Sequence, residues 1–334
     1  MYFASIENGQ FSSLVPVMEV RSFLTGKRGV SLPFTDYCEP IIQDKGIFVN
    51  LVNSLIEYGK SRGWKYIELR GGDRYLRNQE TGGRNQDRIL NPGTFSSNLQ
   101  SAFPISQSEG PTPCSYITYL GHTLDLTKGE KALYSGLRGS TRRNIKKALK
   151  KGVGVRTLNS LEFVQEFYRL NCMTRKKHGL PPQPYRFFRK VCDHIISKGL
   201  GFITLASHNG QNIAGAVFFH FGCDAVFKYG ASDNKFQHLR PNNLVMWEAI
   251  KWYCQNGYKK LSLGRTDPDN QGLLQFKSGW GGKQENINYY KYEKSKEAFI
   301  NIPSPSNYFE NRILKYMPVA LLKIVGSTFY RHLG

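Results

Sequence analysis

The stretch from residue 261 to 282, LSLGRTDPDNQGLLQFKSGWGG, most constrains how this chain can fold. It opens with a short apolar run typical of a buried strand and continues into a polar loop around Asp267. A short amphipathic segment follows and ends at Lys277. α/β proteins often place chemically active side chains where a buried strand runs into a polar loop. The stretch therefore predicts an α/β domain with a candidate site just after this strand.

The residues around this stretch predict that it belongs to one α/β domain over 153–292. Periodic apolar residues and turn signals give the order β-α-α-β-β-β-α-β-α-β. The expected strands are 153–156, 202–207, 213–221, 225–230, 261–263 and 286–292, and the expected helices lie within 159–179, 185–198, 242–255 and 273–277. Asn159 is expected to cap the first helix, with Glu162 completing a capping box.

The N-terminal part of the chain repeats one unit of this domain. Residues 51–71 and 244–265 each predict an amphipathic helix that ends at Gly-aromatic-Lys and enters an apolar strand. Five pairs of residues correspond at a constant offset of 194: Gly63 with Gly257, Trp64 with Tyr258, Lys65 with Lys259, Ile67 with Leu261 and Leu69 with Leu263. Two copies of one α/β domain would explain such a repeat.

Four regions are expected along the chain. They are a partly truncated N-terminal domain over 1–127 with a long polar loop at 71–113, a basic helical segment over 128–152, a C-terminal domain over 153–295, and an amphipathic tail over 296–334.

Positive charge is concentrated in the segment between the two copies. The chain carries 46 Lys and Arg against 25 Asp and Glu, a formal charge of +21, which favours an anionic partner. The run RGSTRRNIKKALKKG (138–152) is expected to be helical after a break near Gly139, and its cations repel one another without any acid among them. Two interpretations stay open: a solvated helix face, or a phosphate-binding face that uses Arg142, Arg143 and Lys146.

The sequence disfavours several other classes of protein. The six cysteines are scattered without a CxxC pair, which disfavours a zinc ribbon and fits reduced, packed thiols in a cytosolic protein. No signal-peptide pattern opens the chain, and no apolar run has the ~18 residues that a membrane-spanning helix needs. We therefore expect a cytoplasmic protein without a bound metal.

Four stretches resemble the Fem-type branch of the GNAT acyltransferase superfamily, which includes the peptidoglycan bridge-forming aminoacyltransferases and BioF2-like acetyltransferases. The stretches are RRNIKKALKKGV (142–153), KKHGLP (176–181), LRPNNLVMWEAI (239–250) and LGRTDPDNQGLLQFKSGWGG (263–282). Weaker similarity covers 33–41 and the helix at 51, whereas 71–113 is unmatched. The resemblance implies a mixed α/β fold of tandem GNAT-like domains, each with a central mixed sheet flanked by helices.

The resemblance also implies an activity. A transferase of this kind, acting in cell-envelope biogenesis, moves an activated acyl or aminoacyl group onto an amine. It forms no covalent enzyme intermediate, so positioning and charge stabilisation carry the rate. In the Fem-type motif the lysine of Phe-Lys lies near the acyl linkage of the donor. This assigns Lys277 to catalysis and Phe276 to the wall of the acyl site.

Further candidate residues come from the chemistry of the side chains. Arg265 and Arg240 are expected to bind phosphates, and Asp267 or His238 to accept the proton of the amine. Three glycines, 279, 281 and 282, are expected to leave room for a substrate beside the backbone. The remaining substrate-binding candidates are Asn242, Tyr229 and Trp280.

The loop before the helix at 242 bears on the donor. CoA-using GNAT proteins place a glycine-rich loop there, whose N–H groups hold the pyrophosphate. Residues 237–243 contain no glycine, and Pro241 lacks an N–H donor. This disfavours acetyl-CoA. We expect no tightly bound cofactor, an aminoacyl-tRNA or acyl-CoA cosubstrate, and an anionic partner such as a tRNA acceptor end or a diphosphate-linked precursor.

Two other functions stay open: an acyl-CoA-dependent N-acyltransferase, and a non-catalytic GNAT-derived scaffold that binds RNA or anionic membrane through its basic helix. The tail over 309–333 mixes apolar and basic residues. It is expected either to contact the inner face of an anionic membrane or to dock on the protein as a packing helix.

Overall fold

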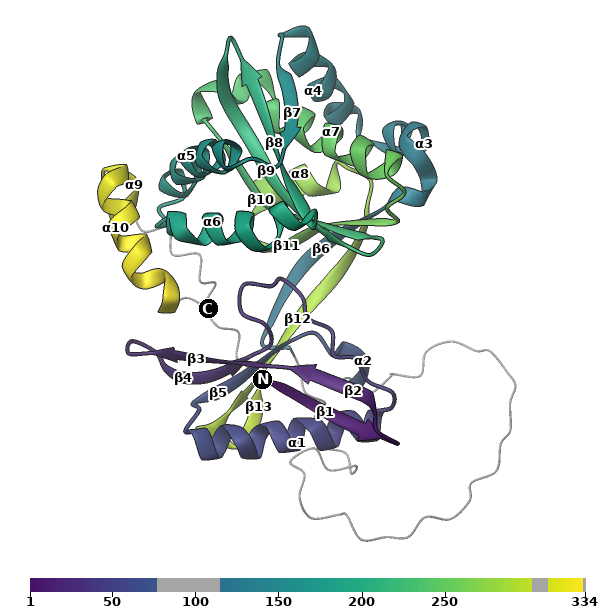
Figure 1. Ribbon diagram of the computed structural model, residues 1–334, viewed down its shortest axis with the longest axis vertical. Helices are drawn as coiled ribbons and strands as arrows, with labels where there is room; N and C mark the ends of the chain where they lie inside the picture. Colours follow the sequence, from purple (N-terminus) through teal and green to yellow (C-terminus); the bar gives the residue numbers. More distant parts are fainter. Residues whose placement is uncertain (77–114, 302–311, 333–334) are drawn as a thin grey trace. The chain divides into compact units, whose positions relative to one another are not determined.

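The computed structural model describes residues 1–76, 115–301 and 312–332 (Figure 1). Its contacts divide the chain into two compact units. Unit 1 comprises Met1–Thr118 and Ile287–Pro305, and unit 2 comprises Tyr119–Asn286 and Ser306–Leu333. The predicted polar loop lies outside the described residues from position 77 onward. The domain limits expected from the sequence stay a prediction.

Unit 2 is built on a mixed sheet in the order β6-β11-β10-β9-β8-β7. Its strands are β6 (Ile117–Asp125), β7 (Gly154–Leu158), β8 (Gly201–His208), β9 (Gln211–Phe221), β10 (Asp224–Ser232) and β11 (Lys260–Thr266). β10 and β11 are parallel, and every other neighbouring pair in this order is antiparallel. The sheet is therefore mixed, as predicted.

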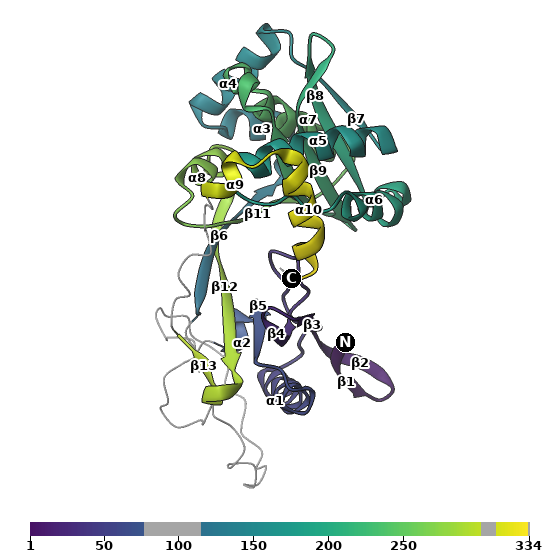
Figure 2. The ribbon, with the colours of Figure 1, turned by 90° about the vertical axis from the view of Figure 1, so that its left-hand side faces the viewer.

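Helices cover both faces of this sheet (Figures 1 and 2). One face carries α3 (Gly129–Gly136), α4 (Gly139–Lys150), α7 (Pro241–Gln255) and α8 (Gln271–Ser278), and the other carries α5 (Leu161–Lys177) and α6 (Tyr185–His194). Side chains alternate along a strand, so Phe202 of β8 joins the core beneath α7 while its neighbour Ile203 joins the core beneath α5. α10 (Val319–Phe329), after the short α9 (Arg312–Tyr316), packs on α5.

Unit 1 holds a smaller set of strands around α1 (Lys45–Arg62). Its strands are β1 (Tyr2–Glu7), β2 (Gln10–Pro16), β3 (Met18–Ser22), β4 (Gly26–Val30), β5 (Tyr66–Arg70), β12 (Lys283–Glu293) and β13 (Ala298–Ile300), and a short helix, α2 (Asp73–Leu76), follows β5. β1 and β2 form a hairpin, whereas β3, β4, β5 and β12 are neighbours in that order.

Units 1 and 2 each contain a β-α-β motif, which confirms the predicted repeat. α1 joins the parallel strands β4 and β5, and α7 joins the parallel strands β10 and β11. Each helix is followed by a left-handed glycine, Gly63 or Gly257, and then by an aromatic residue that leads into the strand. β3 pairs antiparallel with β4 as β9 does with β10.

The predicted order of elements over 153–292 is confirmed, with two local corrections. The capping box at Asn159 is wrong, because α5 begins at Leu161 with Ser160 as its N-cap and has no side-chain cap bond. Asn159 therefore lies one residue too early. The α-helix expected over 185–198 ends at His194 and continues only as a 3₁₀ turn from Ile196 to Lys198.

Among the described residues, no helix is both long and apolar enough to cross a membrane.

Candidate functional site

The candidate site lies at the carboxyl end of β11. β11 pairs with β10 only over Lys260–Ser262, while β10 continues beside β9 to Ser232. On its other side, β11 fits one extra residue against β6, because Ser262 faces Thr123 but Arg265 faces Gly121. The bulge contains Gly264 at φ 71°, a left-handed conformation that favours glycine. Bulges of this kind re-aim side chains next to active sites.

Lys277 lies against this bulge. It is in the last turn of α8, whose N-terminus is capped by the Asn270 side chain accepting from the Leu273 N–H at 3.1 Å. The Lys277 side chain is 3% exposed, and its Nζ donates to the carbonyl oxygens of Gly264 at 3.0 Å and Arg265 at 2.9 Å. The strand end therefore holds a positive charge in surroundings where electrostatic interactions are stronger than in water.

Three buried polar side chains near Lys277 lack a hydrogen-bond partner among the described residues. They are His122 at both ring nitrogens, Thr266 at Oγ1 and Trp280 at Nε1. His122 shares a face of β6 with Leu124, in the core beneath α7, and Thr266 pairs with Leu120 on that same face. Such atoms cost about 1–3 kcal/mol each when buried. Their presence beside a buried ammonium is typical of a functional site rather than of a plain core.

Burial lowers the pKa of His122, and the nearby charge of Lys277 lowers it further, whereas a contact with the Gln284 side chain, which does not have the geometry of a hydrogen bond, opposes the shift. His122 is therefore neutral at pH 7. The sequence analysis assigned it no role. The available signal was the alternation of Leu120, His122 and Leu124, a pattern typical of a strand that puts a histidine among core residues.

We expect the imidazole of His122 to titrate below the ordinary histidine value of about 6.5. Since the unfolded chain then takes up the proton first, the free energy of unfolding should fall as the pH drops below about 6.5, and His122→Gln should remove that part of the fall. Imidazole NMR titration measures the midpoint directly. Lys277→Met should raise it, and an unchanged midpoint in that variant would contradict the electrostatic coupling.

Arg265, Asp267 and Phe276 are predicted site residues that lie between the end of β11 and Lys277 in the sequence. The Arg265 guanidinium lies over the Tyr119 ring, 4.5 Å from its centroid. Asp267 accepts from the Asp269 N–H through Oδ1 at 3.0 Å, in the polar loop before α8. The Phe276 ring packs edge-on against Trp280 with centroids 5.8 Å apart. The loop thus keeps a half-buried cation and a carboxylate at the end of β11.

The loop after β10 carries the other predicted polar residues. His238 is exposed and donates from Nδ1 to the Lys235 carbonyl at 3.0 Å. Arg240 is exposed in a left-handed conformation just before α7, and Asn242 donates to Ser232 Oγ at 3.2 Å. Because β10 and β11 are parallel neighbours, the loops that follow them leave the same edge of the sheet. The predicted residues of the loop after β10 and those of the loop after β11 therefore lie at the same edge of the sheet.

One predicted substrate contact lies elsewhere. Tyr229 packs among Phe187 and Phe188 of α6, so it belongs to the face opposite Lys277. Trp280 lies near Lys277, but it is only 1% exposed and belongs to the core beneath α7.

The expectation that the glycines leave room for a substrate is wrong for all three. A Cβ on Gly279 would lie 2.5 Å from Thr141 Oγ1, and one on Gly281 would lie 2.8 Å from the Gly136 carbonyl oxygen. These two glycines allow close packing against the junction of α3 and α4. A Cβ on Gly282 would lie 2.8 Å from the Thr123 carbonyl oxygen, so this glycine allows close packing against β6.

The basic helix α4 starts beside this site. Its buried face, Ile145 and Ala148, packs in the core with α7. Arg138 donates its backbone N–H to the Gly279 carbonyl at 3.0 Å and its Nη2 to Ser278 Oγ at 3.2 Å. Of the predicted phosphate ligands, Arg143 and Lys146 are exposed, whereas Arg142 donates to the Ser135 carbonyl at 3.0 Å. Cations therefore extend from the end of α8 along α4.

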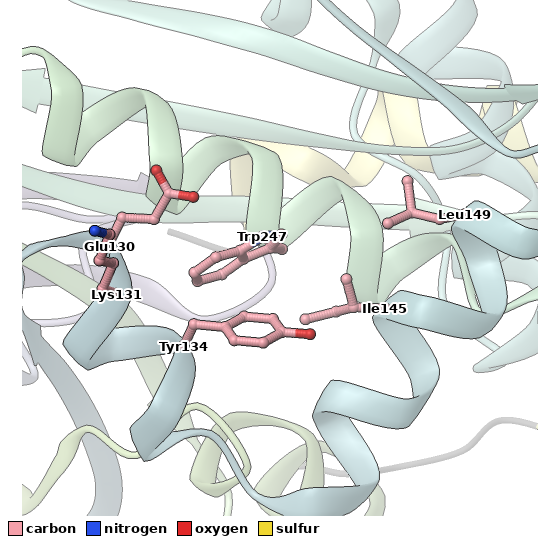
Figure 3. Close-up of a pocket in the computed structure, with 6 residues that line it drawn as sticks. All are labelled: Glu130, Lys131, Tyr134, Ile145, Leu149 and Trp247. Carbon is pink, nitrogen blue, oxygen red and sulfur yellow. The ribbon is translucent and has the colours of Figure 1, made fainter.

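A cavity of about 400 Å³ lies between α3, α4 and α7 (Figure 3). It is lined by Glu130, Lys131, Tyr134, Ile145, Leu149 and Trp247. The Tyr134 and Trp247 rings are 5.0 Å apart and leave a largely apolar hollow along α4.

The matching strand end in unit 1 is chemically different. Glu68, at the end of β5, accepts from the Tyr116 hydroxyl at 2.5 Å and from Arg70 Nε at 2.7 Å. Arg70 also donates to the Thr35 carbonyl at 2.9 Å. These charged groups satisfy one another within unit 1, whereas the end of β11 keeps a buried cation beside orphaned polar atoms. The candidate site is therefore the one in unit 2.

Within the part of the chain that the structure describes, no group of three or more His, Cys, Asp or Glu is placed to hold a metal ion.

Comparison with known proteins identifies the domain that carries this site. Residues 135–278 match the family model described as an acetyltransferase (GNAT) domain. The match runs from the end of α3 through Lys277. This region of the chain is therefore similar to a GNAT domain.

One curated relative is a lipid II:glycine glycyltransferase of Staphylococcus haemolyticus, 36% identical over 84 residues, which is 23% of this chain and 20% of that protein. The chain thus spans about a fifth of that relative's length in the matched region. Among solved structures, the crystal structure of FemX superposes with a TM-score of 0.62 at 15% identity, covering 89% of this chain and 88% of that one.

A tandem GNAT protein from the clavulanic acid biosynthesis pathway superposes with a TM-score of 0.51 at 9% identity, covering 87% of this chain and 81% of that one. At these identities the structural matches show the fold, a mixed α/β architecture of tandem GNAT type. They agree with the β-α-β unit that units 1 and 2 share.

Proposed function

We propose that this chain is an acyl- or aminoacyltransferase that moves an activated acyl group onto an amine of a cell-envelope precursor. The observation that carries the proposal is the buried ammonium of Lys277, fixed by two carbonyls at the end of β11 within a GNAT domain. The lipid II:glycine glycyltransferase similarity supports aminoacyl transfer in cell-wall formation.

The proposed reaction needs no covalent enzyme intermediate. The amine nitrogen attacks the carbonyl carbon of an ester or thioester, a C–N bond forms, and the bond from that carbon to the leaving oxygen or sulfur breaks. The positive charge of Lys277 stabilises the negative charge that develops on the carbonyl oxygen. Asp267 or His238 takes the proton lost by the amine, because both lie in the loops that leave this edge of the sheet. Phe276 forms the wall of the acyl site.

We propose aminoacyl-tRNA as the donor, ahead of acyl-CoA. Pro241 is the first residue of α7 and has no N–H, and the Asn243 N–H already donates to the Arg240 carbonyl at 3.2 Å. Few backbone donors are thus left for a pyrophosphate at this helix start. Side-chain cations are abundant instead: Arg240 precedes α7, Arg265 lies at the end of β11, and the exposed cations follow α4. Such side chains suit a polyanionic donor.

The acceptor we propose is an anionic, diphosphate-linked precursor, and the place of action is the inner face of the membrane where such precursors are anchored. The formal charge of +21 favours both the precursor and an anionic surface.

Mixing the purified full-length chain with aminoacyl-tRNAs and peptidoglycan precursors tests the proposal. Mass spectrometry should show an acceptor heavier by one aminoacyl residue, and calorimetry should show acetyl-CoA binding weaker than micromolar. Micromolar acetyl-CoA affinity with acetyl transfer would support the acyl-CoA-dependent alternative instead. RNA or vesicle binding without transfer from any donor would support the non-catalytic scaffold.

A further inference from the structure

The C-terminal helices have one face packed on the protein and one face exposed. Leu322 and Gly326, four residues apart on α10, are buried where this helix packs on α5, and Val319 joins the core beneath α5 and α6. This part of the tail is therefore a packing helix, one of the two expectations from the sequence. Its packing also fixes which residues face outward.

The outward residues are large and apolar. Tyr316 at the end of α9 is 87% exposed, and on α10 Leu321 is 50% and Ile324 is 61% exposed. Leu321 and Ile324 are three residues apart, so they lie on one side of the helix. Ile313 is exposed on α9, three residues before Tyr316. An exposed apolar cluster on consecutive helices marks an interaction surface.

The positive charge of the C-terminal helices indicates what kind of partner their exposed face would bind. Residues 312–332, RILKYMPVALLKIVGSTFYRH, contain Arg312, Lys315, Lys323 and Arg331 and no acidic residue. A second copy of this chain would bring its own +21 charge against these cations. An anionic lipid surface attracts them and accepts the apolar residues between them. At 11 residues, α10 is far shorter than the ~20 residues that span a bilayer, so it suits an orientation along the interface.

We propose that the outer face of α9 and α10, formed by Ile313, Tyr316, Leu321 and Ile324, is a membrane-docking surface for an anionic bilayer. The proposal goes beyond the proposed function, which names an acceptor and a place of action but no surface of contact. It is also independent of catalysis, because docking is measured without donor or acceptor.

Vesicle flotation tests the surface. The full-length chain should float with vesicles of phosphatidylcholine and phosphatidylglycerol and far less with phosphatidylcholine alone. Tyr316→Ser, Leu321→Ser and Ile324→Ser combined should lower the partition coefficient by about tenfold or more. The matched control is Phe221→Ser at the β9–β10 turn, which removes a ring that is 81% exposed and should leave flotation unchanged. Circular dichroism checks that the variants fold.

Two outcomes would overturn the proposal. If the triple variant floats as well as the wild type while Arg143→Gln with Lys147→Gln abolishes flotation, α4 alone binds the vesicles. If the wild type does not float and light scattering shows a dimer that the triple variant loses, a second copy covers this face. A supporting second readout is Tyr316→Trp, whose emission should be quenched by brominated anionic lipids.

Discussion

Lys277→Met is expected to lower turnover by about 10²- to 10³-fold, because it removes a fixed positive charge that faces developing negative charge. Methionine keeps the length and the apolar stem of the side chain, so the shape of the site changes little. The structure adds a stability effect, since the carbonyls of Gly264 and Arg265 lose the hydrogen bonds from Nζ. We expect a loss of about 1–3 kcal/mol in the free energy of unfolding. The chain should still fold.

Two matched variants separate charge from structure in this experiment. Lys277→Arg restores the charge and should recover part of the turnover if charge is what the reaction needs. Lys260→Met makes the same chemical change at an exposed position of β11, the strand whose far end Lys277 contacts, and should leave turnover within about twofold. Single-turnover kinetics with a saturating donor measures the chemical step. Turnover near the wild-type value in a folded Lys277→Met protein would make Lys277 a structural lysine that only joins α8 to β11.

The fold was predictable because its signals are local. Apolar periodicity marks α5, α6 and α7, and the offset of 194 between Gly63 and Gly257 reveals the repeated β-α-β unit before any contact is known. The element limits were less predictable. Asn159 and Glu162 have the spacing of a capping box, but the extended residue directly before α5 is Ser160.

The candidate site was predictable only in part, because its key contacts join distant residues. The Phe276–Lys277 pair pointed to α8, but the burial of Lys277 depends on the bulge at Gly264, which exists only once β6 pairs with β11. The same pairing brings His122 near Lys277, 155 positions later in the chain. Gly279 was misread because a glycine allows close packing as readily as ligand approach, and only the position of Thr141 decides between them.

Removing exposed cations from the basic helix α4 should have the second large effect, in this case on the binding of RNA. Arg143, Lys146 and Lys147 are exposed on α4, and Arg138 ties the start of that helix to Ser278, the neighbour of Lys277. A polyanion bound along α4 would therefore extend to the end of β11. Replacing the three exposed cations by glutamine should weaken binding of unfractionated tRNA on the order of 10- to 100-fold at low salt. The slope of log affinity against log salt should become shallower by about 2–3, since each lost phosphate contact releases fewer counterions.

The control for this variant removes the same charge from another helix surface. Arg189→Gln, Lys190→Gln and Lys198→Gln change three exposed cations in and just after α6, on the opposite face of the sheet. Fluorescence anisotropy over a salt series compares both triple variants with the wild type. If both reduce the slope equally, net charge alone attracts the RNA and α4 is a solvated helix face. A reduction of the slope confined to the α4 variant would identify that helix as the phosphate-binding surface. Bound phosphates would then offset the repulsion among the seven Lys and Arg between residues 138 and 151, a segment that contains no acidic residue.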